Sequence, residues 1–165
     1  MIFTTKAEYG VRLLVELGKQ DGGEAPGAPK SLKSIADSEG LPLAYLERIV
    51  ALLKKSGFVA STRGAHGGYR LAMPAEEIRM DAVIAALEGG VAPMSCFVDD
   101  TAGESAGGAP STRVLCSHHD DGDLCATKLL WTRVQGGVIR ALQNTTLAEL
   151  VAFTQREHPL QLTHS

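Results

Sequence analysis

The 165-residue sequence has no run of eighteen or more apolar residues, which is about the length that a membrane-spanning helix requires. Its first residues, Met1-Ile-Phe-Thr-Thr-Lys, lack the charged stretch, apolar stretch and cleavage site of a secretion signal. Three cysteines are an odd number and too few for a disulfide-stapled secreted domain. We therefore expect a cytoplasmic protein whose thiols are reduced or bound to a metal.

Aromatic residues are also scarce, at 5%, against 44% hydrophobic residues, so aliphatic side chains must form most of the core. The net charge of −3 at first argues against a nucleic-acid partner. The charge is unevenly distributed, however, because residues 30–70 contain seven Lys/Arg and three Asp/Glu, whereas residues 81–165 contain five and ten. A phosphate-binding face, if present, should therefore lie within 30–70. Charge alone, however, favours an ordinary solvated surface.

Two short amphipathic segments in this basic region predict a helix-turn-helix. Ser31 is a typical N-cap residue, and Gly40 is a typical helix stop. Pro42 suits the first turn of a second helix, which carries apolar residues at helical spacing and is predicted to end at Gly57. Two helices of this size joined by a few residues that include glycine are typical of the motif.

A β-hairpin is predicted directly after these helices. Residues 58–62 and 69–72 have strand composition, and the glycine-rich stretch between them is typical of a turn. A hairpin in this position is a wing, and its tip carries Arg63 and His66.

The start of a recognition helix lies against base edges in the major groove, which indicates residues 42–48. Tyr45 and Arg48 could reach phosphates or bases, Glu47 could accept from cytosine N4, and Arg63 suits a phosphate or the minor groove. Each residue alone is better explained as a solvated surface residue, but their combination favours DNA. The predicted DNA-binding residues are Ser31, Pro42, Ala44, Tyr45, Glu47, Arg48, Arg63, His66 and Gly67.

The other expected elements are mostly helical. A first helix begins at Thr4 or Thr5, and further helices are expected over 80–87, 126–144 and 147–153. Residues 89–125 lack a convincing period, and 99–111 are rich in Gly, Ala and Ser, which predicts disorder.

The three cysteines, Cys96, Cys116 and Cys125, flank or lie within this irregular segment and not on an apolar periodic face. Thiolates in such a loop suit a soft metal centre. From the residues alone, three alternatives are level: an iron–sulfur cluster with a fourth ligand from elsewhere, a zinc site completed by His118 or His119, and simple redox thiols.

Five segments together resemble the IscR/NsrR-type winged-helix regulators, which are dimeric bacterial transcription factors, several of them iron–sulfur dependent. The most specific is the wing, Arg-Gly-Ala-His-Gly-Gly-Tyr-Arg-Leu at 63–71. The others are Thr-Thr-Lys-Ala-Glu-Tyr-Gly at 4–10, Leu-Ala-Tyr-Leu-Glu-Arg at 43–48, Gly-Asp-Leu-Cys-Ala-Thr at 122–127 with Leu-Trp at 130–131, and Thr-Leu-Ala-Glu-Leu at 146–150.

The resemblance implies that the three cysteines hold an iron–sulfur cluster, of either the 2Fe–2S or the 4Fe–4S type. Some members complete the cluster with a histidine three residues after the last cysteine, but this chain has Lys128 there, a poor ligand at neutral pH. Others use a carboxylate on the partner's first helix, and the matching residue is Glu8. Glu8 is therefore the first choice and His118 or His119 the second, although a first-turn glutamate also simply suits the helix dipole.

The sequence therefore predicts an α+β, mostly helical homodimer that binds double-stranded operator DNA. Its expected parts are a winged helix-turn-helix domain (1–88), a cysteine-bearing sensing loop (89–125), and a dimerisation helix with a short terminal helix (126–157). Cluster state should change the spacing of the two recognition helices. The main alternative is a cluster-free regulator that senses thiol oxidation or a partner protein. An enzyme is disfavoured because no nucleophile is paired with a base and no phosphate-binding loop occurs. A third alternative is a pure interaction adaptor, which would not retard a DNA duplex in a gel.

Overall fold

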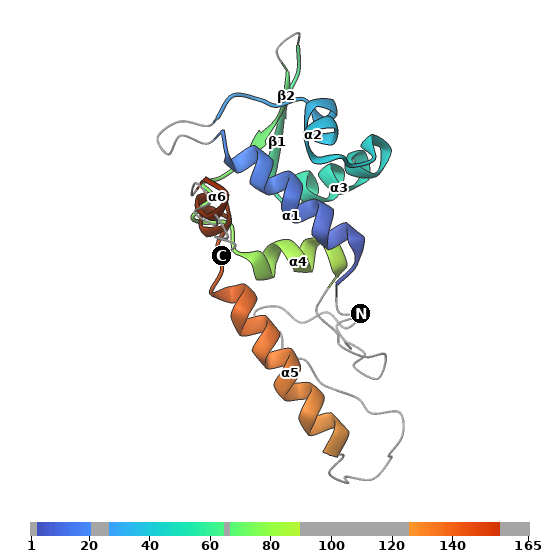
Figure 1. The fold of residues 1–165 in the computed structure, drawn as a ribbon, viewed down its shortest axis with the longest axis vertical. Coiled ribbons are helices and arrows are strands. Elements are labelled where there is room, and N and C mark those ends of the chain that lie inside the picture. Colours follow the sequence, from blue (N-terminus) through green and yellow to red (C-terminus); the bar gives the residue numbers. More distant parts are fainter. Residues whose placement is uncertain (1–2, 21–26, 65–66, 90–125, 156–165) are drawn as a thin grey trace, which may run out of the picture.

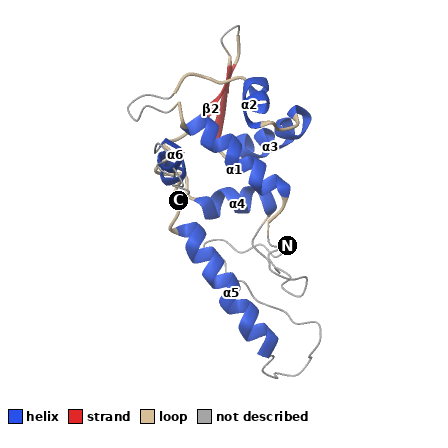
Figure 2. Ribbon diagram, viewed as in Figure 1, coloured by secondary structure: helices blue, strands red, loops and turns tan. Residues whose placement is uncertain are grey.

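The structure is a computed structural model that describes residues 3–20, 27–64, 67–89 and 126–155. Within these residues the chain forms six helices and one antiparallel two-stranded sheet (Figures 1 and 2). The elements are α1 (Thr5–Gly18), α2 (Leu32–Glu39), α3 (Leu43–Lys55), β1 (Val59–Thr62), β2 (Gly68–Leu71), α4 (Met80–Glu88), α5 (Ala126–Gln143) and α6 (Leu147–Gln155). The predicted fold class, a mostly helical α+β winged helix, is confirmed.

Local signals place the helix ends close to where the sequence predicts them. The Thr4 hydroxyl accepts a hydrogen bond from the Lys6 N–H, and the Ser31 hydroxyl accepts one from the Ser34 N–H at 3.0 Å. Gly40 ends α2 in the left-handed region, with φ 64°. Two details differ from expectation: Pro42 is the N-cap of α3 and not its first residue, and α3 ends at Lys55 and not at Gly57.

The wing strands differ from the predicted ranges by one residue, because β1 begins at Val59 and not at Phe58, and β2 spans Gly68–Leu71 and not 69–72. β1 pairs with β2 in a register that runs from Val59 opposite Leu71 to Thr62 opposite Gly68. Phe58 was expected to begin the first strand, but its N–H donates to the Leu53 carbonyl at the end of α3, and its ring is buried. This bond keeps the hairpin close to the end of α3.

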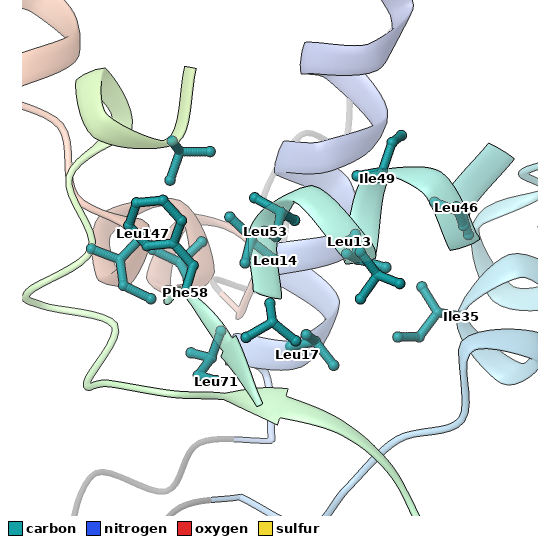
Figure 3. Packing of buried hydrophobic residues seen from close by; sticks show 14 of the residues in the cluster. Leu13, Leu14, Leu17, Ile35, Leu46, Ile49, Leu53, Phe58, Leu71 and Leu147 are labelled. Atoms are coloured by element: carbon teal, nitrogen blue, oxygen red, sulfur yellow. The ribbon is translucent and has the colours of Figure 1, made fainter. Parts of the chain in front are cut away.

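The core lies between α1, α3, α4 and the base of the hairpin (Figure 3). Its largest fully buried side chains are Leu13, Leu14, Ile35, Leu46, Ile49, Leu53, Ile78, Val83 and Leu147. Leu147 belongs to α6, which packs against α1 and so contributes to the same core. The close approach is possible because Gly18 has no side chain: a Cβ there would lie 2.6 Å from Val151 Cγ2.

Helix α5 projects away from this body and contacts it at α4 (Figure 1). Its base is attached through the main chain, because Met80 N–H donates to the Thr145 carbonyl at 3.0 Å and Leu147 N–H to the Ile78 carbonyl at 2.8 Å. Leu129 and Leu130, towards the far end, are 56% and 55% exposed. None of the described helices is both long and apolar enough to cross a membrane.

Candidate nucleic-acid interface

Helix α3 presents one face to the core and the other to solvent. Leu46, Ile49, Val50 and Leu53 are buried at helical spacing. The opposite face carries Pro42, Ala44, Glu47 and Arg48, all predicted DNA contacts and all exposed. The first turns of α3 therefore offer one carboxylate, one guanidinium and a small apolar surface, which are groups that can read base edges.

Tyr45 is placed differently from the exposed residues around it. Its ring is half-buried and packs edge-to-face on Tyr9 of α1, with the ring centroids 5.7 Å apart. Such pairs contribute about 0.5–1.5 kcal/mol beyond the area that they bury. Tyr45 therefore contributes to holding α3 on α1, whatever its hydroxyl contacts.

The turn between α2 and α3 is braced from α1. Arg12 Nε donates to Glu39 Oε2 and Arg12 Nη2 to the Glu39 carbonyl, both at 2.8 Å. At the other end of α2, exposed Ser31 caps the helix with its hydroxyl oxygen. Contact of Ser31 with DNA remains a prediction; in the fold, its oxygen already accepts the capping hydrogen bond from the Ser34 N–H.

The wing carries Arg63 directly after β1, exposed to solvent. Gly67 closes the tip, since its N–H donates to the Gly64 carbonyl at 2.9 Å. The neighbouring predicted contact, His66, lies outside the described residues. In Figure 1 the wing and the pair α2–α3 lie at one end of the molecule, and α5 extends at the other.

The candidate metal ligands are mostly outside the part of the chain that the structure describes. Cys96, Cys116, Cys125, His118 and His119 all fall in 90–125, as does the stretch 99–111 predicted to be disordered. Among the described residues no group of three or more His, Cys, Asp or Glu could hold a metal. Glu8 is described: its side chain is 64% exposed, with Arg12 Nη1 at 3.9 Å from Oε1.

Sequence reasoning missed a buried ion cluster at the end of α1. The side chain of Glu16 is 7% exposed and forms ion pairs with Lys19 and, at 2.6 Å, with Lys30 Nζ. Burial would raise the pKa of Glu16, but hydrogen bonds from the two lysines and their charges outweigh it and lower the pKa to about 2. One signal was available, since Glu16 lies between Leu13 and Leu17 on the buried face of the helix.

The described residues form a winged helix-turn-helix, the fold of a class of DNA-binding proteins. Its parts are two short helices, an exposed first turn on the second helix, and a hairpin with a basic residue at its tip. Comparison with known proteins makes the class more specific. The family described as Rrf2, iron-dependent transcriptional regulator, matches residues 3–153. The chain belongs to the Rrf2 family of transcriptional regulators, as the sequence resemblance indicated, and it is not an enzyme.

Two named transcriptional regulators, CymR and IscR, are similar to it over almost the whole chain. The transcriptional regulator CymR of Bacillus subtilis is 33% identical, with 95% of this chain and 94% of CymR covered. IscR of Serratia proteamaculans is 35% identical, with 92% and 79% covered. The solved structure of B. subtilis CymR, described as the global cysteine regulator, has a TM-score of 0.69 over 93% of this chain and 98% of CymR. The T. potens IscR structure has a TM-score of 0.68 at 30% identity, with 100% and 94% covered.

Proposed function

We propose that this regulator binds operator DNA as a homodimer, with the start of α3 in the major groove and the wing against the adjacent backbone or minor groove. The observation that carries this proposal is that the wing and the pair α2–α3 lie at one end of the molecule, where α3 has an exposed face and Arg63 is exposed directly after β1. Winged-helix dimers read two half-sites about one DNA turn apart, so subunit spacing sets affinity.

Helix α5 is the proposed dimer contact. Its stripe Leu130, Val134, Val138 and Leu142 recurs at helical spacing, and Leu130 and its neighbour Leu129 remain more than half exposed within one chain. Pairing with the same helix of a second copy would bury this surface, as two-fold interfaces do. We also propose that the chain is divided into three parts, 1–88, 89–125 and 126–157. Helix α6 of the third part packs on α1 of the first.

The proposed signal is an iron–sulfur cluster held by Cys96, Cys116 and Cys125, with Glu8 of the partner subunit as fourth ligand and His118 or His119 as the alternative. The described part of this donor set suits the role, because Glu8 is an exposed carboxylate whose salt bridge to Arg12, at 3.9 Å, is long. A bound cluster would supply sensitivity to oxygen, nitric oxide or iron status. Glu8, a harder donor than a thiolate, would be its most exchangeable ligand.

A cluster-free regulator of thiol or cysteine status is the second candidate. It is favoured by the similarity to CymR, which is as extensive as the similarity to IscR. In that case the three cysteines would act as thiols, and Glu8 would be an ordinary first-turn residue.

Anaerobic purification separates the two candidates. A cluster protein should be brown, contain iron and acid-labile sulfide, and lose its visible absorption when any one cysteine is replaced by Ala. Glu8→Ala should shift the spectrum while three thiolates remain, whereas His118→Ala and His119→Ala should not. A colourless wild-type protein that still retards DNA would instead establish the cluster-free candidate. Bleaching by a histidine substitution, with Glu8→Ala unchanged, would transfer the fourth position to that histidine.

A further inference from the structure

The wing is attached to the rest of the DNA-binding domain by a third extended segment. Lys30 pairs with Tyr69 of β2 through two main-chain hydrogen bonds of 2.9 Å, Lys30 N–H to the Tyr69 carbonyl and Tyr69 N–H to the Lys30 carbonyl. The neighbouring Gly68 makes this approach possible, because a Cβ there would lie 2.5 Å from the Lys30 carbonyl oxygen. The next residue, Ser31, caps α2. Lys30 therefore joins the wing directly to the helix-turn-helix.

The side chain of Lys30 is held in turn by Glu16 of α1. Its Nζ lies 2.6 Å from Glu16 Oε2, and only 18% of the lysine side chain is exposed. The same carboxylate binds Lys19, which belongs to the C-terminal end of α1 itself. The side chain of Glu16 is itself only 7% exposed, so its carboxylate has little room to move.

A buried ion pair of this kind adds little net stability, because desolvation offsets most of the attraction between the charges. Its geometric effect is larger, since an unpaired charge at this position would be costly and the lysine is therefore confined to one place. With the Lys30 ammonium fixed on α1 and its main chain fixed on β2, the direction of the hairpin is tied to the core.

We propose that Glu16 is a positioning residue for DNA binding, which holds the wing at its working angle through Lys30 and does not itself contact DNA. The inference rests on the proposed contact of the wing with DNA. Lys30 is basic and lies next to the helix-turn-helix, but on this proposal it connects β2 to α1 and does not bind a phosphate.

The test combines substitutions in the Glu16–Lys30 ion pair, called the clamp below, with one substitution on the wing. Glu16→Gln removes the charge in an isosteric side chain, and Lys30→Met removes the ammonium while keeping the stem. Lys19→Met is the matched control, because Lys19 also pairs with Glu16 but has no main-chain bond to β2 in the described structure. Arg63→Ala removes the wing contact alone. Affinity for one operator duplex is measured by fluorescence anisotropy over a range of salt, at a temperature where each variant is fully folded by circular dichroism.

If Glu16 acts through the wing, Glu16→Gln and Lys30→Met should each weaken DNA binding more than twofold. The loss of affinity should not exceed the loss caused by Arg63→Ala. They should also lower the salt slope, by no more than Arg63→Ala. In the Arg63→Ala background they should cost less than twofold further, because the contact that they position is already gone. Lys19→Met should change affinity less than twofold. A merely structural role would not move the salt slope of folded protein.

Several results would overturn the proposal. Full additivity with Arg63→Ala would mean that Glu16 and Lys30 act elsewhere, or that Lys30 binds a phosphate itself. Tighter binding by Glu16→Gln would mean that the carboxylate merely masks two lysines. Unchanged affinity in both clamp variants, with Arg63→Ala weakened, would refute the clamp and leave the proposed function standing. If Arg63→Ala has no effect, the wing contact fails. Hydrogen exchange of the Tyr69 amide then tests the clamp separately. The clamp predicts faster exchange in Glu16→Gln than in the wild-type protein.

Discussion

Removal of Arg63 from the wing is the most direct test of the proposed DNA contact. The side chain is exposed directly after β1, so Arg63→Ala should leave the fold and its stability nearly unchanged. If its guanidinium neutralises one phosphate, the slope of log affinity against log salt falls by roughly 0.9 per bound subunit, and by about 1.8 for a dimer on a full site.

These slopes translate into a measurable change of affinity. Between 50 and 200 mM salt, the ratio of wild-type to variant affinity should shrink about 3.5-fold for one phosphate and about 12-fold for two. Fluorescence anisotropy with an operator duplex selected by the wild-type protein measures both slope and affinity.

Arg79→Ala is the matched control, because it removes the same charge from a residue that precedes α4 and is paired with Asp81 at 2.6 Å, away from the wing. Its slope should stay at the wild-type value. Equal slopes and affinities for Arg63→Ala and wild type would remove Arg63 from the interface, and an equal effect of Arg79→Ala would show only a response to net charge.

Three further changes test the dimer, the packing and the ion cluster. Val134→Glu should place a charge in the proposed α5 interface and yield monomers or aggregates in light scattering, whereas Thr132→Glu, at an exposed position of α5, should remain dimeric. Gly18→Ala should destabilise by up to about 2 kcal/mol in urea unfolding, because overpacking against the stiff Val151 costs about 1–3 kcal/mol and exceeds the gain of about 1 kcal/mol in helix propensity; equal or higher stability would contradict the close approach of α1 and α6. The lowered pKa of Glu16 means that its charge stabilises the fold above pH 4.5 and that this contribution, at most about 3 kcal/mol, disappears as the pH falls towards 2. The stability difference between wild type and Glu16→Gln should therefore shrink on acidification, and a constant difference would refute the assignment.

Much of the fold follows from signals that act over a few residues. Ser31 and Gly40 mark the ends of α2 because a hydroxyl cap and a left-handed glycine satisfy helix ends locally. The small errors have local causes as well. Pro42 takes the extended N-cap conformation, with ψ 119°, and the Phe58 N–H donates to the Leu53 carbonyl of α3, so that β1 begins one residue later. Such choices depend on what the neighbouring element offers.

The candidate site divides in the same way. The exposure of Ala44, Glu47 and Arg48 follows from the apolar period of α3, since the buried stripe leaves only one outward face. The packing of Tyr45 on Tyr9 does not follow from that period, because it depends on how α1 crosses α3. The choice between cluster and thiol sensing depends on cysteines outside the described residues.

The sequence by itself determined the helix-turn-helix, the wing, the long α5 and the class of function, because caps, glycine turns and apolar periods are short-range properties. Only the tertiary structure decided that α6 packs on α1, that Lys30 pairs with Tyr69, and that Glu16 is buried between two lysines. The physical reason is that each of these depends on contacts between segments distant in the chain. Their energies arise only when the core brings Gly18 against Val151 and Lys30 against α1.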